Sequence, residues 1–74
     1  MSVKYAVIFE QAANNWAAYV PDLPGCMTTG QTMDETNRNI VEAIRGHIQS
    51  LREFGEPVPE PTSHVGEVEI THTA

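Results

Sequence analysis

A segment rich in proline and glycine, residues 20–35, constrains the fold of this chain more than any other part of its sequence. Pro21 and Pro24 fix two backbone φ angles at about −65° and remove two amide donors. Gly25 and Gly30 can adopt positive φ at little steric cost. These residue types predict a rigid turn that sets the direction of the chain on either side of it.

The same segment marks the start of a helix. Thr32 and Glu35 form a T-x-x-E capping box, in which each side chain can bond an amide left unpaired at a helix N-terminus. Apolar residues then recur at spacings of three, four and seven, which predicts an amphipathic helix from about Met33 to Phe54. Gly55 predicts the helix end. Gly46, inside the helix, predicts a close approach between helix and sheet.

Short runs of β-branched and aromatic residues surround this helix in the sequence. They predict strands at residues 3–10, 16–20 and 26–29 before it and at 65–71 after it. The first two strands form an antiparallel hairpin, and a right-handed crossover returns the last strand parallel to the first. The sequence therefore predicts one α+β domain over residues 1–74. Its element order is βββαβ and its strand order 3-2-1-4, with the helix packed on one face of a small four-stranded sheet.

Composition and charge narrow the classes of function. A single cysteine excludes an intrachain disulfide and a Cys-rich zinc site, and it favours a cytoplasmic protein. No apolar run approaches the roughly 20 residues that span a bilayer, and the first residues lack the features of a signal peptide. The net charge of −6 argues against a phosphate-binding surface and favours a basic partner.

The chemically active side chains form no catalytic pattern. A two-metal nuclease needs several carboxylates that converge, whereas the adjacent Asp34 and Glu35 point about 100° apart on a helix. The histidines lack metal-ligand spacing, and Cys26 is expected to be a buried thiol. We therefore expect no enzymatic activity, no metal and no cofactor. The other carboxylates and the histidines that we weighed as catalytic or metal-binding groups are Glu10, Asp22, Glu42, His47, His64 and His72.

Taken in order, the motifs resemble the signature of the HicB-like antitoxin family. The sequence D-L-P-G-C is followed by G-x-T, an acidic pair, E-A-hydrophobic within the helix, and a closing G-x-x-V-P-x-P. The resemblance covers roughly residues 3–70. One departure is Thr36-Asn37, where the family often has small or aliphatic residues, which predicts a less buried first helical turn. The motif residues up to the capping box are Asp22, Leu23, Pro24, Gly25, Cys26, Gly30, Thr32 and Glu35.

The resemblance implies a fold like a truncated ribonuclease H core and the role of a non-enzymatic antitoxin. HicB-like proteins are understood to neutralise HicA toxins, which are small basic proteins that cleave mRNA. Family members commonly add a C-terminal DNA-binding module, and this sequence leaves no space for one. A short form without direct nucleic-acid binding is therefore expected. The alternative is a stand-alone oligomeric module, structural or ligand-binding, with no toxin partner.

Two sets of residues are candidates for protein contacts. Acidic groups could meet a basic toxin, and the face of the sheet opposite the helix is apolar enough to predict a homo-oligomer, either a dimer or a tetramer. The motif D-L-P-G-C is itself interpreted as a turn. The partner-binding candidates are Glu10, Asp22, Glu56 and Glu60, and the oligomer candidates are Ala6, Ile8, Ala17 and Tyr19.

Overall fold

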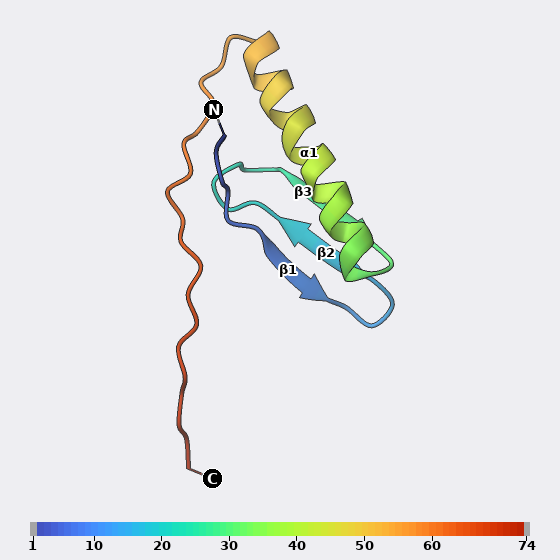
Figure 1. Cartoon of the computed structure of the whole chain (residues 1–74), viewed down its shortest axis with the longest axis vertical. Helices are drawn as coiled ribbons and strands as arrows, with labels where there is room; N and C mark the ends of the chain where they lie inside the picture. The colour runs from blue at the N-terminus through green and yellow to red at the C-terminus, as the bar shows by residue number, and fades with distance from the viewer. Residues whose placement is uncertain (1, 74) are drawn as a thin grey trace.

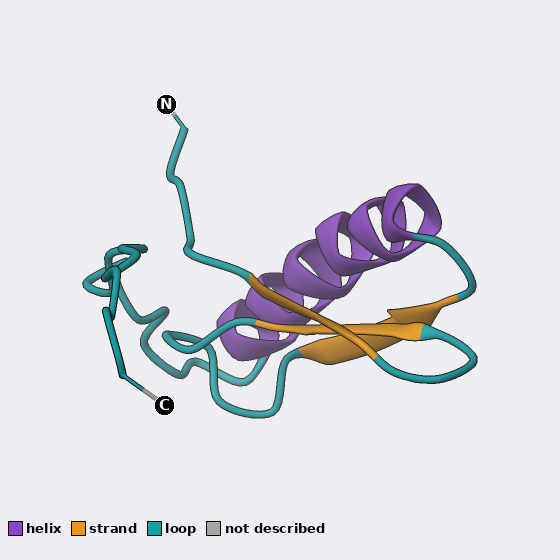
Figure 2. Cartoon of the chain, turned by 90° about the horizontal axis from the view of Figure 1, so that it is seen from below, coloured by secondary structure: helices purple, strands orange, loops and turns teal. Residues whose placement is uncertain are grey.

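The fold is a three-stranded antiparallel sheet with one long helix on one face (Figures 1 and 2). The computed structural model describes residues 2–73. Its strands are β1 (Ile8–Gln11), β2 (Trp16–Tyr19) and β3 (Met27–Gly30), in the spatial order β1-β2-β3. Helix α1 spans Met33–Glu53. The predicted α+β class and the first four elements are confirmed, although β1 is shorter than predicted.

The register of the sheet separates a core face from an outer face. Phe9 pairs with Ala18, and Ala18 pairs with Thr28, so these residues share one face. Ala18 is buried, and Phe9 packs against the core. Helix α1 covers this face mainly over β3 and β2, and Asn39 Nδ2 of the helix donates to Thr29 O of β3 at 2.9 Å. Strand β1 therefore lies at the margin of the core.

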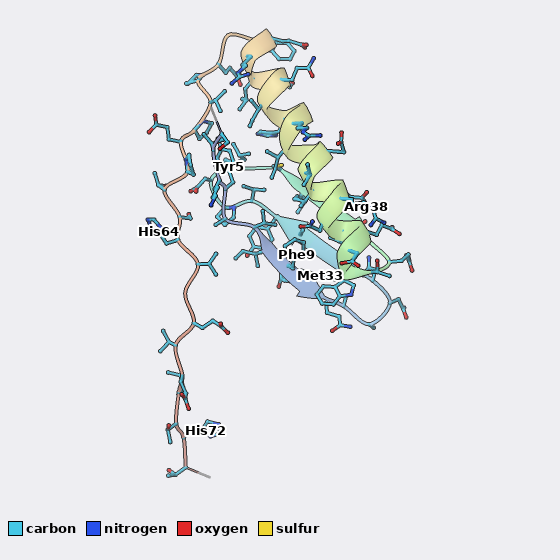
Figure 3. The ribbon with its side chains drawn as sticks, viewed as in Figure 1. Tyr5, Phe9, Met33, Arg38, His64 and His72 are labelled. Atoms are coloured by element: carbon cyan, nitrogen blue, oxygen red, sulfur yellow. The ribbon has the colours of Figure 1, made fainter. Side chains whose placement is uncertain are left out.

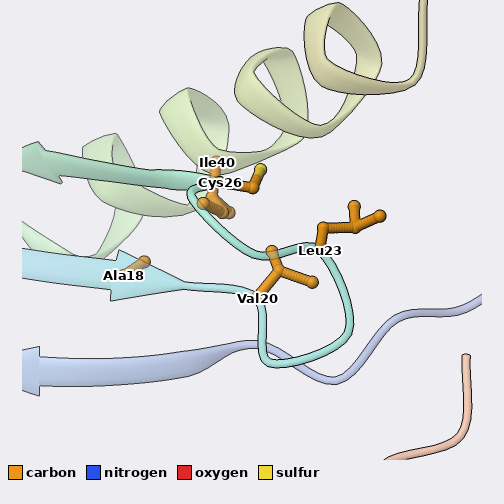
Figure 4. Close-up of a cluster of buried hydrophobic side chains, with 5 residues drawn as sticks. All are labelled: Ala18, Val20, Leu23, Cys26 and Ile40. Atoms are coloured by element: carbon orange, nitrogen blue, oxygen red, sulfur yellow. The ribbon is translucent and has the colours of Figure 1, made fainter. Parts of the chain in front are cut away.

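Two consecutive turns between β2 and β3, residues 20–26, supply the centre of the core. Leu23 N donates to Val20 O and Cys26 N donates to Leu23 O, at 3.1 and 3.0 Å. A proline follows the first residue of each turn, which is the position where its fixed φ fits. Gly25 has φ 86°, as the third position of a type II turn requires. All three turn-forming residues, Val20, Leu23 and Cys26, are consequently buried together with Ile40 of α1 (Figure 4).

The ends of α1 follow the predicted signals. Glu35 N donates to Thr32 Oγ1 at 3.1 Å, and the Glu35 carboxylate in turn accepts from Gln31 N at 3.2 Å. The expected capping box is present, with the returning bond on the amide one residue earlier. At the other end Gly55 has φ 69°, and the amides of Gly55 and Glu56 donate to carbonyls of the last turn. This is the Schellman arrangement that glycine permits.

Three expectations about close packing near the helix were wrong. Gly30 does not use positive φ; instead, a Cβ there would lie 2.4 Å from Thr36 Oγ1. Thr36 is fully buried rather than poorly covered, because its hydroxyl donates to Thr32 O at 2.7 Å and so needs no water. Gly46 faces open space, with nothing within 4 Å of an added Cβ. The close approach of helix and sheet therefore occurs at Gly30, in β3.

The predicted fourth strand at residues 65–71 is absent, and so is the strand order 3-2-1-4. Beyond α1 the described residues contain no strand, and the segment 56–73, which we call the tail, runs away from the sheet (Figure 1). Residues 65–71 have strand propensity, but a strand also needs a neighbour for its amides and carbonyls. Contacts earlier in the tail direct this segment away from β1.

Candidate partner-binding surface

Asp22 holds the tail against the two consecutive turns of residues 20–26, which we call the double turn. Its Oδ2 accepts from the amides of Thr62 and Ser63, both at 2.9 Å. Its Oδ1 accepts from the Thr62 and Ser63 hydroxyls at 3.1 and 2.8 Å. A second link joins the Tyr5 hydroxyl to Pro59 O. We call the Asp22–Thr62–Ser63 contact the clamp; it fixes where the last residues of the chain leave the body of the protein.

The clamp also sets the charge state of Asp22. The hydrogen bonds from Ser63, backbone first and side chain second, lower the pKa of the Asp22 carboxyl from its usual value of 3.8, and those from Thr62 add to the effect. Donors to a carboxylate favour its charged form. Asp22 is therefore an anion whose acceptor sites are used within the chain.

The predicted partner-binding acids do not form one cluster. Glu10 lies at the end of β1, near the start of α1, whereas Glu56 follows the other end of this helix of 21 residues. Such a helix is about 30 Å long. Glu56 precedes the first proline of the tail and Glu60 lies between the last two. Both are exposed, and Asp22 meets the tail two residues beyond Glu60. The structure thus brings Asp22 together with the Glu60 side of the tail and leaves Glu10 apart.

Three of the four basic residues lie on α1. Arg38, Arg45 and Arg52 recur every seven residues along α1 and hence share one stripe of the helix. Arg45 pairs with Glu42 at 3.1 Å on the exposed surface. An open groove of about 620 Å³ is lined by Arg45, Ile48, Gln49, Arg52 and Glu53. The tail, by contrast, carries Glu56, Glu60, Glu67 and Glu69 and no lysine or arginine. The tail is therefore acidic throughout, whereas α1 carries both acidic and basic side chains.

An apolar row crosses the outer face of the sheet. Ile8 of β1 pairs with Tyr19 of β2, which pairs with Met27 of β3. Met27 is 68% exposed and Tyr19 is 39% exposed. The predicted oligomer residues Ala6, Ile8 and Ala17 are half-buried. Sequence reasoning missed Met27, although its alternation with Thr28 in β3 carried the signal.

The described residues offer no metal centre, since no group of three or more His, Cys, Asp or Glu side chains among them could hold an ion. His64 and His72 lie along the tail, far from the helix (Figure 3). Cys26 is buried, as expected, and burial raises the pKa of its thiol. No helix in the described part of the chain combines the length and the apolar character needed to cross a membrane.

The residues of the tail that hold the clamp were not foreseen. Thr62 and Ser63 directly follow the last proline of the segment 57–61. Adjacent hydroxyl residues after a rigid extended segment can present two amides and two hydroxyls to one carboxylate. The sequence therefore indicates a set of hydrogen-bond donors at Thr62 and Ser63. Their acceptor, Asp22, is forty residues from Thr62 in the sequence, so only the fold identifies it.

Several known proteins are similar to this chain in sequence. A UPF0150 protein of Thermoplasma acidophilum is 43% identical over 77% of this chain and 84% of its own length. One from Synechocystis is 39% identical over 76% of this chain and 72% of its own. A protein of Haemophilus phage HP1 is 36% identical over 76% of this chain but only 42% of its own length.

Among solved structures, one chain of a HicA3 and HicB3 toxin–antitoxin complex superposes with a TM-score of 0.71. It is 30% identical, and the match covers 81% of this chain and 70% of that one. The model of the family described as HicB-like antitoxin of bacterial toxin–antitoxin systems matches residues 5–72, nearly the whole sequence. This chain belongs to the HicB-like antitoxin family.

Proposed function

We propose that this protein binds and neutralises a small basic HicA-like toxin that cleaves mRNA. The observation that carries the proposal is the likeness to a chain from a HicA3 and HicB3 complex. The net charge of −6 supports it, because an acidic surface attracts a basic RNA-binding protein and speeds their encounter. The antitoxin acts by covering the toxin and takes no part in catalysis. Its place of action is the cytoplasm, where the mRNA is.

The proposed contacts are the exposed acids near the ends of the sheet and helix. Glu56 and Glu60 present free carboxylates on the tail side, and Glu10 presents one at the far end of β1. Asp22 acts indirectly, because its oxygens already accept four hydrogen bonds from Thr62 and Ser63. It positions the tail segment that carries Glu60.

Titration with a purified HicA-like toxin tests this proposal. The double variant E56K/E60K is expected to bind at least tenfold more weakly, since like charges across an interface repel. E42K reverses one charge on the exposed surface of α1, where Glu42 pairs with Arg45, and is the matched control for the single variants E56K and E60K. Failure of the wild-type chain to bind a HicA-like toxin or to block its cleavage of RNA would contradict the proposal.

The alternative function is that of a stand-alone oligomeric module without a toxin. The row Ile8, Tyr19 and Met27 favours self-association through the outer face of the sheet, with Ala6 and Ala17 beside it. We propose this face as a homo-oligomer contact in either case. Tyr19→Glu places a charge in the row and is expected to lower the mass measured by light scattering. An unchanged oligomer in that variant would exclude this face.

A further inference from the structure

The last part of the tail has the composition of a strand but no partner. Val65, Val68 and Ile70 are 71%, 83% and 71% exposed, although β-branched residues are typical of a half-buried pleated surface. Three such side chains within six residues make an unusual solvated segment. Their exposure indicates that residues 65–71 meet another surface.

This segment is also chemically ready to join a sheet. In an extended chain Val68 and Ile70 point to one face, and Glu67 and Glu69 to the other. No proline occurs after Pro61, so every later amide can donate to a neighbouring strand.

Strand β1 presents a matching free edge. It bonds to β2 along one side, and no described strand pairs with its other side. Edge strands are usually protected by proline, several charges or a covering segment, whereas Ile8–Gln11 has one charge and no proline. Because α1 packs over β3 and β2, Tyr5, Val7 and Phe9 near this edge stay half-buried (Figure 3). An added strand would cover them.

Within one chain the clamp keeps this segment and this edge apart. Asp22 holds Thr62 and Ser63 against the double turn, and the following residues run straight away from the sheet while β1 runs at an angle to them (Figure 1). The molecule consequently measures 53 Å along its longest axis and 28 and 21 Å across. Within one chain, residues 65–71 are thus left without a strand partner.

We propose that residues 65–71 of one copy add as a fourth strand to the β1 edge of a second copy, and reciprocally. Each copy offers one unpaired extended segment and one unpaired β1 edge, so two copies can exchange these segments reciprocally. Reciprocal pairing about a two-fold axis confines this contact to two copies. The strand that the sequence predicts is then formed between chains instead of within one.

Side-chain chemistry on both faces fits a second copy. Val68 and Ile70 extend the apolar face beside Val7 and Phe9. On the other face Lys4, which alternates with Tyr5, would meet the side of the strand that carries glutamates. Lys4 is the one lysine or arginine of the chain outside α1. In the proposed pairing, Lys4 of one copy therefore lies near the β1 edge that receives Glu67 and Glu69 of the other copy.

Light scattering and hydrogen exchange on the full chain alone, without toxin, test the proposal. V68D/I70D is expected to halve the mass of the wild-type assembly, because two buried charges would oppose strand addition. Both residues are exposed within one chain, so α1 and the sheet β1–β3 should stay folded, and the helical circular dichroism signal should be retained. The control F54D places a charge on an exposed apolar side chain outside both the segment 65–71 and the β1 edge, and it should keep the mass. In the wild type, amides 66–71 should be protected, and this protection should fall on dilution.

A mixture of ¹³C-labelled and unlabelled chains identifies which molecule supplies the strand. Magnetisation transfer between the methyl groups of Val68 or Ile70 and the ring of Phe9 is expected between labelled and unlabelled chains. Contacts only within a chain would overturn the proposal, as would an assembly that Tyr19→Glu dissociates but V68D/I70D leaves intact. So would protection of residues 65–71 that appears only when a HicA-like toxin is added.

Discussion

At the scale of single residues, Gly30 and Gly46 show that the structural role of a glycine depends on the atoms around it. Both interrupt regular elements, and glycine in either place loses backbone entropy on folding. Gly30 lies where β3 passes the first turn of α1, and an added Cβ would meet Thr36 Oγ1 at 2.4 Å and Thr36 N at 2.8 Å. Gly46 lies in α1 with nothing near it. The sequence alone predicted the packing role for the wrong one.

Alanine substitution at the two positions should therefore have opposite effects on the free energy of unfolding. G30A is expected to destabilise by about 1–3 kcal/mol, because the buried Thr36 backbone cannot move away cheaply. G46A is expected to stabilise by about 1 kcal/mol, the difference in helix propensity. Urea denaturation of both variants checks this pair. Equal effects of the same sign would contradict the packing described for Gly30.

The clamp at Asp22 should respond to acid. Because the folded pKa of Asp22 lies below 3.8, its stabilising contribution is present above that pH and is lost as the pH falls through the lowered value. The amide NMR signals of Thr62 and Ser63 are expected to titrate together with an apparent pKa below 3.8. D22N should abolish this titration and leave the tail cleaved faster by protease at neutral pH. Unchanged titration in D22N would assign it to another group.

At the scale of elements, the helix start and the double turn were readable from sequence because their causes are local. The prolines, Gly25 and the capping pair Thr32 and Glu35 each act within a few residues. Leu23 and Cys26 become buried because two successive turns place every third residue on the inside. The motif that identifies the family therefore serves mainly to build the fold.

Removing the helix cap should cost what a cap usually contributes. T32A takes away the acceptor for Glu35 N and is expected to lower the free energy of unfolding by about 1 kcal/mol. T32S keeps the hydroxyl and should retain most of the stability. Thermal denaturation followed by circular dichroism compares them. Equal stability of T32A and the wild type would show that the cap contributes nothing to the fold.

At the scale of the whole molecule, the tail is acidic, with four glutamates and no lysine or arginine. If toxin binding uses exposed acids such as Glu56 and Glu60, its association rate should fall steeply between low and physiological salt, where the screening length shortens to about 8 Å. Stopped-flow measurements at several salt concentrations check this. A rate independent of salt would favour an apolar interface instead.

The sequence by itself determined the α+β class, three strands, the capped helix and the family. All of these arise from short-range periodicity, turn chemistry and residues at fixed spacings. Only the tertiary structure decided the rest: that Gly30 makes the close approach, that Asp22 clamps Thr62 and Ser63, and that residues 65–71 stay off their own sheet. Each depends on partners distant along the chain. A pattern of residues specifies what a segment can pair with, but the path of the folded chain decides what comes within reach.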